Sequence, residues 1–149
     1  MNRFPIIFLL LIVCPVVVFG FDGPTMGWSS WNTYRVNIND SLIRRQADAL
    51  VRSGLKDAGY NHVNIDDGFF GGRDEATGEL KFHPVRFPSG LKGTVDYVHS
   101  LGLRAGIYSD AGANTCGCYW DNDTIARNVG LLGHETRDAR LFFKDIGFD

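Results

Sequence analysis

The sequence has few cysteines and almost no net charge, and these two shortages exclude several classes of protein. Its three cysteines are Cys14, Cys116 and Cys118. Cys116 and Cys118 are too close for an unstrained disulfide, and two thiolates make half of a zinc site, so no disulfide framework or zinc finger is predicted. The formal net charge is -2 and no basic run is interleaved with aromatics, which argues against a nucleic-acid partner.

The chain also lacks an apolar run that is long enough to be a confident membrane span. Residues 6–18 are almost wholly apolar, Arg3 precedes them, and residues 18–20 fit a signal-peptidase site. This pattern is typical of a secretory signal peptide. We therefore expect residues 1–20 to be removed, residues 21–149 to have no membrane partner, and the protein to be secreted or extracytoplasmic. An uncleaved N-terminal anchor is the alternative.

The remaining sequence predicts three strand-then-helix units. We expect strands over 26–31, 62–67 and 103–109, and amphipathic helices over 42–58, 91–101 and 134–146. Alternation of strands and helices predicts a parallel sheet. Long loops, 69–87 and 110–133, follow strands, whereas the connections after helices are short, which is typical of a (β/α)8 TIM barrel. The fold class is therefore α/β, with the first three βα units of a barrel. A doubly wound sheet is the alternative, but 26–31 is not a glycine-rich phosphate turn.

Two adjacent acids, Asp66 and Asp67, follow the second predicted strand, and Asp110 follows the third. The C-terminal ends of parallel strands are where α/β proteins hold polar ligands. Ionised carboxylates need partners, and sugar hydroxyls can donate to each of them. Equally, one acid could cap the turn while the other is solvated. A metal site built from the three acids is a weaker interpretation, because no histidine or cysteine has supporting spacing.

Several aromatic residues lie near the same strand ends. Trp28 and Trp31 belong to the first strand segment and Tyr108 to the third. Aromatic rings pack on the apolar faces of sugars, so Trp28 and Tyr108 are candidate pocket residues, whereas Trp31 is more often a core residue in such a position. His83 and His134 are interpreted as surface or capping residues rather than ligands.

These candidates occur within motifs that resemble the α-galactosidase family, the melibiase-type glycoside hydrolases. The motifs follow the family's order from about residue 24 to the end: Met26-Gly27-Trp28-Ser29-Ser30-Trp31-Asn32, Asn64-Ile65-Asp66-Asp67, Phe87-Pro88-Ser89-Gly90, Gly106-Ile107-Tyr108-Ser109-Asp110-Ala111-Gly112, and Leu132-Gly133-His134-Glu135 followed by Asp138-Ala139. Each is weak alone, and together they are specific.

The resemblance implies a (β/α)8 catalytic barrel, usually followed by a β-sandwich, that hydrolyses terminal α-D-galactosides with retention and needs no cofactor. Asp66 and Asp67 match acids that hold galactose hydroxyls, and Trp28 and Tyr108 match aromatics that line the sugar. The substrate partner would be a galactoside oligosaccharide or glycoconjugate. Asp110 would contact residues of the site rather than the sugar itself. Cys116 matches a cysteine whose disulfide partner follows the nucleophile.

The resemblance also indicates what residues 21–149 lack. It assigns the nucleophile to the end of strand four and the acid/base to the end of the strand two further on, and both positions come after Asp149. Asp149 itself would lie at the start of strand four, on the side of the barrel away from the site. We therefore expect a fragment without activity of its own. A non-catalytic galactoside-binding protein is the rival interpretation. Relatives acting on α-N-acetylgalactosaminides or β-L-arabinopyranosides are further alternatives.

Three departures from the family pattern concern loops. Val36 and Gly68 stand where many relatives have cysteines, which is consistent with the joint loss of one disulfide. The segment 118–131 is longer than in the plant and animal enzymes, so no contact from that segment is carried over from the resemblance.

Overall fold

A computed structural model describes residues 24–149, so the predicted signal peptide lies outside the described residues. The chain forms a three-stranded parallel sheet in the order β1-β2-β5, with β1 at Gly27–Ser29, β2 at His62–Ile65 and β5 at Arg104–Ile107. The register pairs Trp28 with Val63, and Val63 with Ala105. The predicted parallel sheet is thus confirmed, and all three predicted units are present.

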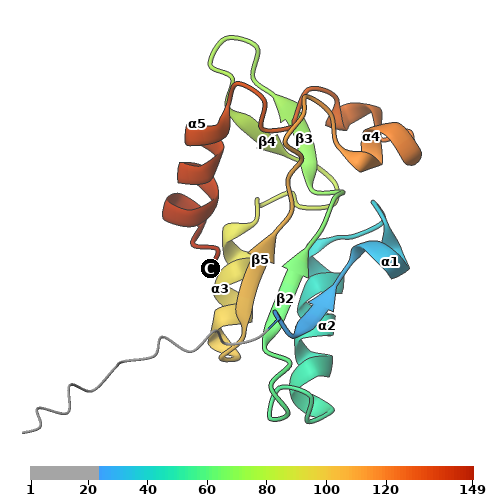
Figure 1. The fold of residues 1–149 in the computed structure, drawn as a ribbon, viewed down its shortest axis with the longest axis vertical. Coiled ribbons are helices and arrows are strands. Elements are labelled where there is room, and N and C mark those ends of the chain that lie inside the picture. Colours follow the sequence, from blue (N-terminus) through green and yellow to red (C-terminus); the bar gives the residue numbers. More distant parts are fainter. Residues whose placement is uncertain (1–23) are drawn as a thin grey trace, which may run out of the picture.

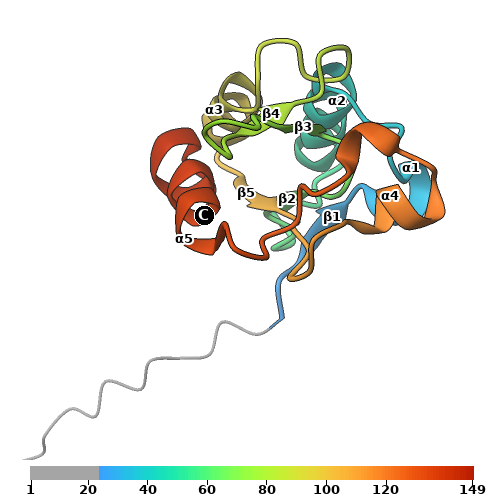
Figure 2. The same cartoon turned by 90° about the horizontal axis from the view of Figure 1, so that it is seen from above.

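Two helices cover one face of this sheet (Figure 2). They are α2 at Asp40–Arg52 and α3 at Lys92–Ser100. Val63 and Ile65 alternate with half-buried residues along β2, so their side chains point toward the helices. They join a continuous core whose helical members include Ile43, Ala47, Leu50, Val95 and Val98. Burial of this apolar face is the main force that holds the units together.

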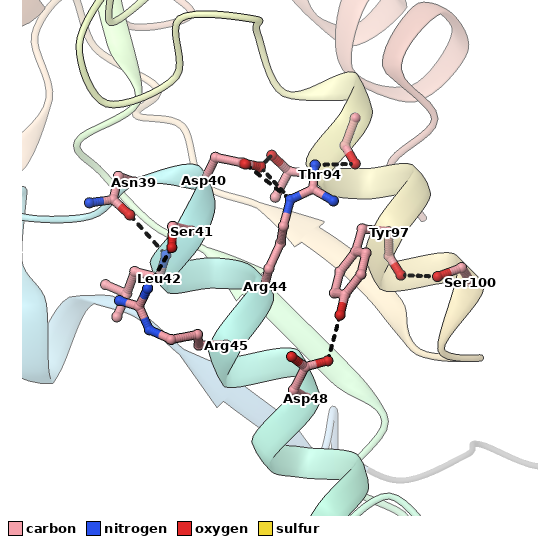
Figure 3. Close-up of polar contacts among 11 residues, drawn as sticks. Asn39, Asp40, Ser41, Leu42, Arg44, Arg45, Asp48, Thr94, Tyr97 and Ser100 are labelled. Atoms are coloured by element: carbon pink, nitrogen blue, oxygen red, sulfur yellow. Dashed lines mark hydrogen bonds and ion pairs between the residues drawn. The ribbon is translucent and has the colours of Figure 1, made fainter.

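Polar contacts fix α2 against α3 at their exposed side (Figure 3). The Asn39 side chain accepts a hydrogen bond from the Leu42 amide at 2.8 Å, so Asn39 is the N-cap of α2. Tyr97 of α3 donates to Asp48 of α2 at 2.6 Å, and Arg44 lies over the Tyr97 ring, 4.8 Å from its centre. These bonds set the relative rotation of the two helices.

The end of α2 differs from the prediction. The helix was expected to continue to Ala58, with Leu55 on its apolar face, but it ends at Arg52 and Leu55 is 43% exposed. Gly54 adopts a φ of 78°, a left-handed conformation that ends helices. Leu55 lies at helical spacing, so the sequence pattern predicted a further helical turn there. The left-handed conformation of Gly54 prevents that turn.

The segment 69–87, expected to be a loop, contains an antiparallel hairpin formed by β3 (Phe70–Arg73) and β4 (Leu80–Phe82). Its short strands contain Gly71 and Gly72, which weaken the strand pattern in the sequence. The segment 110–133 likewise contains α4 (Cys116–Trp120) and a 3-10 turn, η1 (Thr124–Ala126). Figure 1 shows the hairpin between α4 and α5.

The third predicted helix is present as α5 (Glu135–Ala139), which continues as the π-helix η2 (Arg140–Ile146) and ends at Gly147. Phe142 and Ile146 are buried as expected, whereas Ala139 and Phe143 are exposed. Phe142 packs edge-on against Phe69 of the hairpin segment, with ring centres 6.1 Å apart. The wider turn of the π-helix changes which residues share a face.

The last residue continues beside the sheet. Asp149 donates its backbone N–H to the Ala105 carbonyl at 3.0 Å, next to the start of β5. Among residues 24–149, none of the helices combines the length and the apolar character that crossing a membrane requires.

Candidate functional site

The structure brings Asp66 and Tyr108 together at the C-terminal end of the sheet. Asp66 directly follows β2 and Tyr108 directly follows β5, and these strands are hydrogen-bonded neighbours. An open hollow of about 420 Å³ runs along the strands beneath them. It is lined by Ser29, Asn64, Ile65, Asp66, Gly106, Ile107, Tyr108, Phe143 and Asp149. Two of the four predicted substrate residues therefore share one surface.

Asp66 is half-buried and keeps unused acceptor capacity. Its Oδ1 accepts the Asp67 amide at 2.8 Å, and its Oδ2 accepts a hydrogen bond from Ser29 Oγ at 3.3 Å. Its own amide donates to Ser30 Oγ at 3.0 Å, which fixes the backbone. A carboxylate offers about four lone-pair positions, so Asp66 can accept further hydrogen bonds from ligand hydroxyls.

Asp67 is fully buried and bonds to two loops. Its Oδ1 accepts the Gly68 amide at 2.7 Å, and its Oδ2 accepts the Gly117 amide at the start of α4 at 2.6 Å. Burial raises the pKa of this carboxyl above its usual value, although the Gly117 amide, Thr115 and the Gly68 amide act in the opposite direction. The alternative in which one acid caps the turn thus accounts for the hydrogen bond from the Gly68 amide to Asp67. The hydrogen bond from α4 to Asp67 was not predicted from the sequence.

Tyr108 connects the hollow to α4 as well. Its hydroxyl accepts the Cys116 amide at 3.3 Å and lies 3.5 Å from Asp110 Oδ2. Burial raises the pKa of the Tyr108 hydroxyl, so it is neutral at physiological pH. Asp110 also accepts the Gly112 amide at 2.7 Å and does not line the hollow. The supporting role expected for Asp110 remains a prediction.

The structure does not bring Trp28 to the hollow. Trp28 is absent from the lining of the hollow, although its neighbour Ser29 belongs to it. Trp28 instead packs edge-on against Tyr34, with ring centres 6.2 Å apart, beside the core. Trp31, expected to be a core residue, lies outside the core on α1 (Trp31–Tyr34), and the Arg35 guanidinium lies 4.9 Å from its ring centre. Neither tryptophan therefore lies where the sequence predicted it: Trp28 packs beside the core and Trp31 lies outside it, and neither lines the hollow.

The turn after the paired acids is held by three contacts. Gly68 has a φ of 115°, and a Cβ at this position would lie 2.7 Å from the Val36 carbonyl oxygen, so only glycine fits. Positions 36 and 68 therefore lie close together. Arg86 donates to the Gly68 carbonyl at 3.0 Å and to Asp123 at 2.5 Å. This pair connects the turn to the long segment 118–131.

The other candidates have structural environments. His83 Nδ1 accepts the Val85 and Arg86 amides at 3.2 Å, which confirms its capping role. His134 directly precedes α5, and its side chain makes no capping bond there. Cys116 and Cys118 are both free thiols and half-buried. In residues 24–149, no group of three His, Cys, Asp or Glu side chains could hold a metal ion.

Comparison with known proteins gives the family. The sequence model of the Melibiase_2 family, described as alpha galactosidase A, matches residues 23–128. The chain belongs to this family. It is 48% identical over 119 residues to a probable alpha-galactosidase of Dictyostelium discoideum, and 50% identical over 119 residues to alpha-galactosidase 3 of Arabidopsis thaliana. These alignments cover 80% of this chain and 28% and 25% of the two relatives.

Solved structures of the α-galactosidase family agree with the fold. Alpha-galactosidase I from Mortierella vinacea superposes with a TM-score of 0.73 at 42% identity, covering 85% of this chain and 29% of that one. The alpha-galactosidase of Saccharomyces cerevisiae, solved with raffinose, gives a TM-score of 0.73 at 36% identity over 85% and 25% of the two chains. The 149 residues thus span between a quarter and a third of these α-galactosidases.

Proposed function

We propose that this chain is the sugar-holding part of a retaining glycoside hydrolase that acts on terminal α-D-galactosides. The observation that carries the proposal is the joint position of Asp66 and Tyr108 on one hollow, in a chain of the α-galactosidase family. Asp66 has acceptor positions free for two sugar hydroxyls, and charge assistance strengthens such bonds. Tyr108 supplies an aromatic wall beside it.

Asp67 is proposed to act with Asp66 in the same subsite. Each of its oxygens accepts one amide and can accept a second hydrogen bond. In the described residues it is closed off from solvent, so a hydroxyl would reach it only after a small displacement of the Gly117 segment. Trp28 supports the subsite through Tyr34 and the core and makes no contact with the hollow.

Catalysis is proposed to require carboxylates beyond these residues. Retention needs two carboxyl groups roughly 5 Å apart, one a nucleophile and one an acid/base. Asp66 and Asp67 are held as acceptors of amide hydrogen bonds, which suits positioning of substrate. Asp149 accepts the Ala105 amide at 2.8 Å and pairs with His99, at the opposite end of β5 from Tyr108. We therefore propose that residues 24–149 bind galactosides without hydrolysing them.

Galactose is favoured over two related sugars by the strength of the structural match. A putative alpha-N-acetylgalactosaminidase from Bacillus halodurans and a β-L-arabinopyranosidase from Geobacillus stearothermophilus match with TM-scores of 0.51 at 26% and 27% identity. Both values are below those of the α-galactosidases. The resemblance further supports a (β/α)8 barrel, a secreted or extracytoplasmic location after removal of residues 1–20, and a disulfide from Cys116 to a cysteine outside this chain.

Titration calorimetry with galactose tests the proposed subsite. The wild-type chain is expected to bind galactose saturably, and Asp66→Ala to weaken binding at least about tenfold, because charged hydrogen bonds contribute about 1.5–3 kcal/mol. Asp57→Ala, which removes an exposed carboxylate before β2, is the matched control. Absence of saturable binding by the folded chain would contradict the proposal.

Incubation with a chromogenic α-galactoside tests the proposal that residues 24–149 do not hydrolyse galactosides. We expect no turnover by the wild-type chain. Turnover that disappears in Asp66→Ala and persists in Asp57→Ala would show that residues 24–149 include the catalytic carboxylates, and it would overturn this account of the chemistry.

A further inference from the structure

Helix α4, whose first residues are bonded to Asp67 and Tyr108, places two large aromatic side chains in solvent. Tyr119 is 66% exposed and Trp120 is 72% exposed. Exposed neighbouring aromatics mark interaction surfaces when they are held in place. Helix α4 overlaps the start of the segment 118–131, and the family resemblance gives no role to that segment.

The start of α4 is bonded directly to the proposed galactose residues. The Gly117 amide donates to Asp67 at 2.6 Å and the Cys116 amide donates to Tyr108 at 3.3 Å. Figure 1 shows α4 and α1 at the same end of the sheet. Residues three and four apart share a helix face, so Tyr119 and Trp120 lie on the same side of α4 as the Cys116 side chain.

The end of α4 is fixed to α1. Asp121, which follows the helix, accepts a hydrogen bond from Arg35 Nε at 2.7 Å, and Arg35 in turn lies over the Trp31 ring. The helix is thus attached at its start to the ends of β2 and β5 and at its end to α1. Two attachments at opposite ends restrain the orientation of this five-residue helix.

The Tyr119 ring is also oriented before any ligand binds. Asn114 Nδ2 donates to the Tyr119 hydroxyl at 3.3 Å, and Asn114 Oδ1 accepts the Asn128 amide at 2.8 Å. An aromatic side chain held by a hydrogen bond loses less conformational entropy on binding than a free one. Its polar surroundings suit a ligand with both hydroxyl groups and apolar C–H faces.

We propose that Tyr119 and Trp120 form an aromatic platform for the sugar residue attached to galactose, that is, for the second ring of the substrate. The ligand class is a pyranose joined through the galactose anomeric carbon. The C–H face of this ring packs on the Trp120 indole, and the Tyr119 ring borders it. This inference rests on the proposed galactose subsite, because the first ring must be held at Asp66 for the second to reach α4.

Saturation-transfer NMR with a disaccharide separates the two rings. The ligand is galactose α-1,6-linked to glucose, and saturation of the protein aromatic protons is expected to reach both rings in the wild-type chain. In Trp120→Ala the signals of the glucose ring are expected to fall by more than half while those of the galactose ring persist. Asp66→Ala is expected to remove both sets. Tyr60→Ala removes a 39% exposed aromatic beside the start of β2 and is the matched control.

Calorimetry supplies the second readout. The disaccharide is expected to bind more tightly than galactose, and Trp120→Ala is expected to weaken its binding about fivefold to tenfold without changing the affinity for galactose. Galactose signals with no effect of Trp120→Ala on the glucose ring would overturn the platform and leave the galactose subsite intact. Absence of saturation-transfer signals from both rings with the folded wild-type chain would overturn the galactose subsite itself. Capture of a second protein by α4, unaffected by either sugar, would also contradict the platform.

Discussion

Asp66 and Asp67 are adjacent, yet they lie in different environments. Asp66 faces the hollow with acceptor positions free, whereas Asp67 is enclosed by the turn after β2 and the start of α4. Burial penalises the charged form of Asp67, and the surrounding amides favour it, with burial the larger effect. In the proposed subsite, Asp66 can therefore contact a sugar directly, whereas Asp67 fixes the start of α4 and can reach a sugar hydroxyl only after the Gly117 segment is displaced.

The burial of Asp67 predicts a raised pKa in the folded chain. The usual value is 3.8, and an NMR titration of the Asp67 carboxyl carbon should show a midpoint above it. Because the folded state then binds this proton more tightly than the unfolded state, the contribution of Asp67 to stability falls as pH rises from 3.8 through the folded pKa. A midpoint at or below 3.8 would show that the hydrogen bonds to Asp67 outweigh the effect of its burial.

Asp74 is an internal control in the same titration. A hydrogen bond from Lys81, with the Thr77 and Ala76 amides, lowers its pKa from 3.8 to about 2. Its midpoint should therefore move in the opposite direction from that of Asp67. Removing the lysine charge in Lys81→Gln should return the Asp74 midpoint toward 3.8 and leave Asp67 unchanged.

At the scale of elements, two glycines at helices α2 and α3 should respond oppositely to alanine. Gly54 follows α2 with a φ of 78°, and nothing lies within 4 Å of an added Cβ there, so the cost of Gly54→Ala is purely conformational. Gly93 lies inside α3 with an ordinary helical φ, and an added Cβ would meet Arg44 at an unstrained 3.5 Å. Gly54→Ala should destabilise the chain by about 1 kcal/mol, and Gly93→Ala should stabilise it by about 0.5 kcal/mol.

Urea unfolding followed by circular dichroism measures both changes. The two variants carry the same substitution, so composition effects cancel, and only backbone conformation and helix propensity differ. Equal shifts of the two midpoints in one direction would show that α2 does not end through the left-handed conformation of Gly54.

The same elements show what the sequence could predict. Local patterns identified the three parallel strands and the helices that follow them, because each depends on residues close in the chain. The hairpin was missed because Gly71 and Gly72 interrupt its strand pattern. The bonds of Asp67 to Gly117 and of Arg73 to Asp138 join residues 50 and 65 positions apart, and no local spacing indicates such contacts.

At the scale of the whole molecule, motif order predicted which residues lie close together better than it predicted the directions of their side chains. Asp66 and Tyr108 were expected at one end of the sheet, and strand neighbours bring them there. Trp28 and Trp31 differed from expectation because a single residue step reverses the face of a strand, and because the strand ends at Ser29 before α1 begins. Prediction of the site from sequence was therefore limited by the exact strand boundary.

The open face of the sheet gives the last prediction. Ile107 and Phe143 line the hollow, and Phe143 is 55% exposed beside the edge strand β5. Apolar surface next to a sheet edge favours dye binding and self-association. Phe143→Ser should lower the fluorescence of the dye ANS and the apparent mass in concentration-dependent ultracentrifugation. Val85→Ser removes a more exposed residue, at 81%, from the connection between β4 and α3 and is the control. An equal response of both variants would show that exposed apolar area in general, rather than this face of the sheet, governs association.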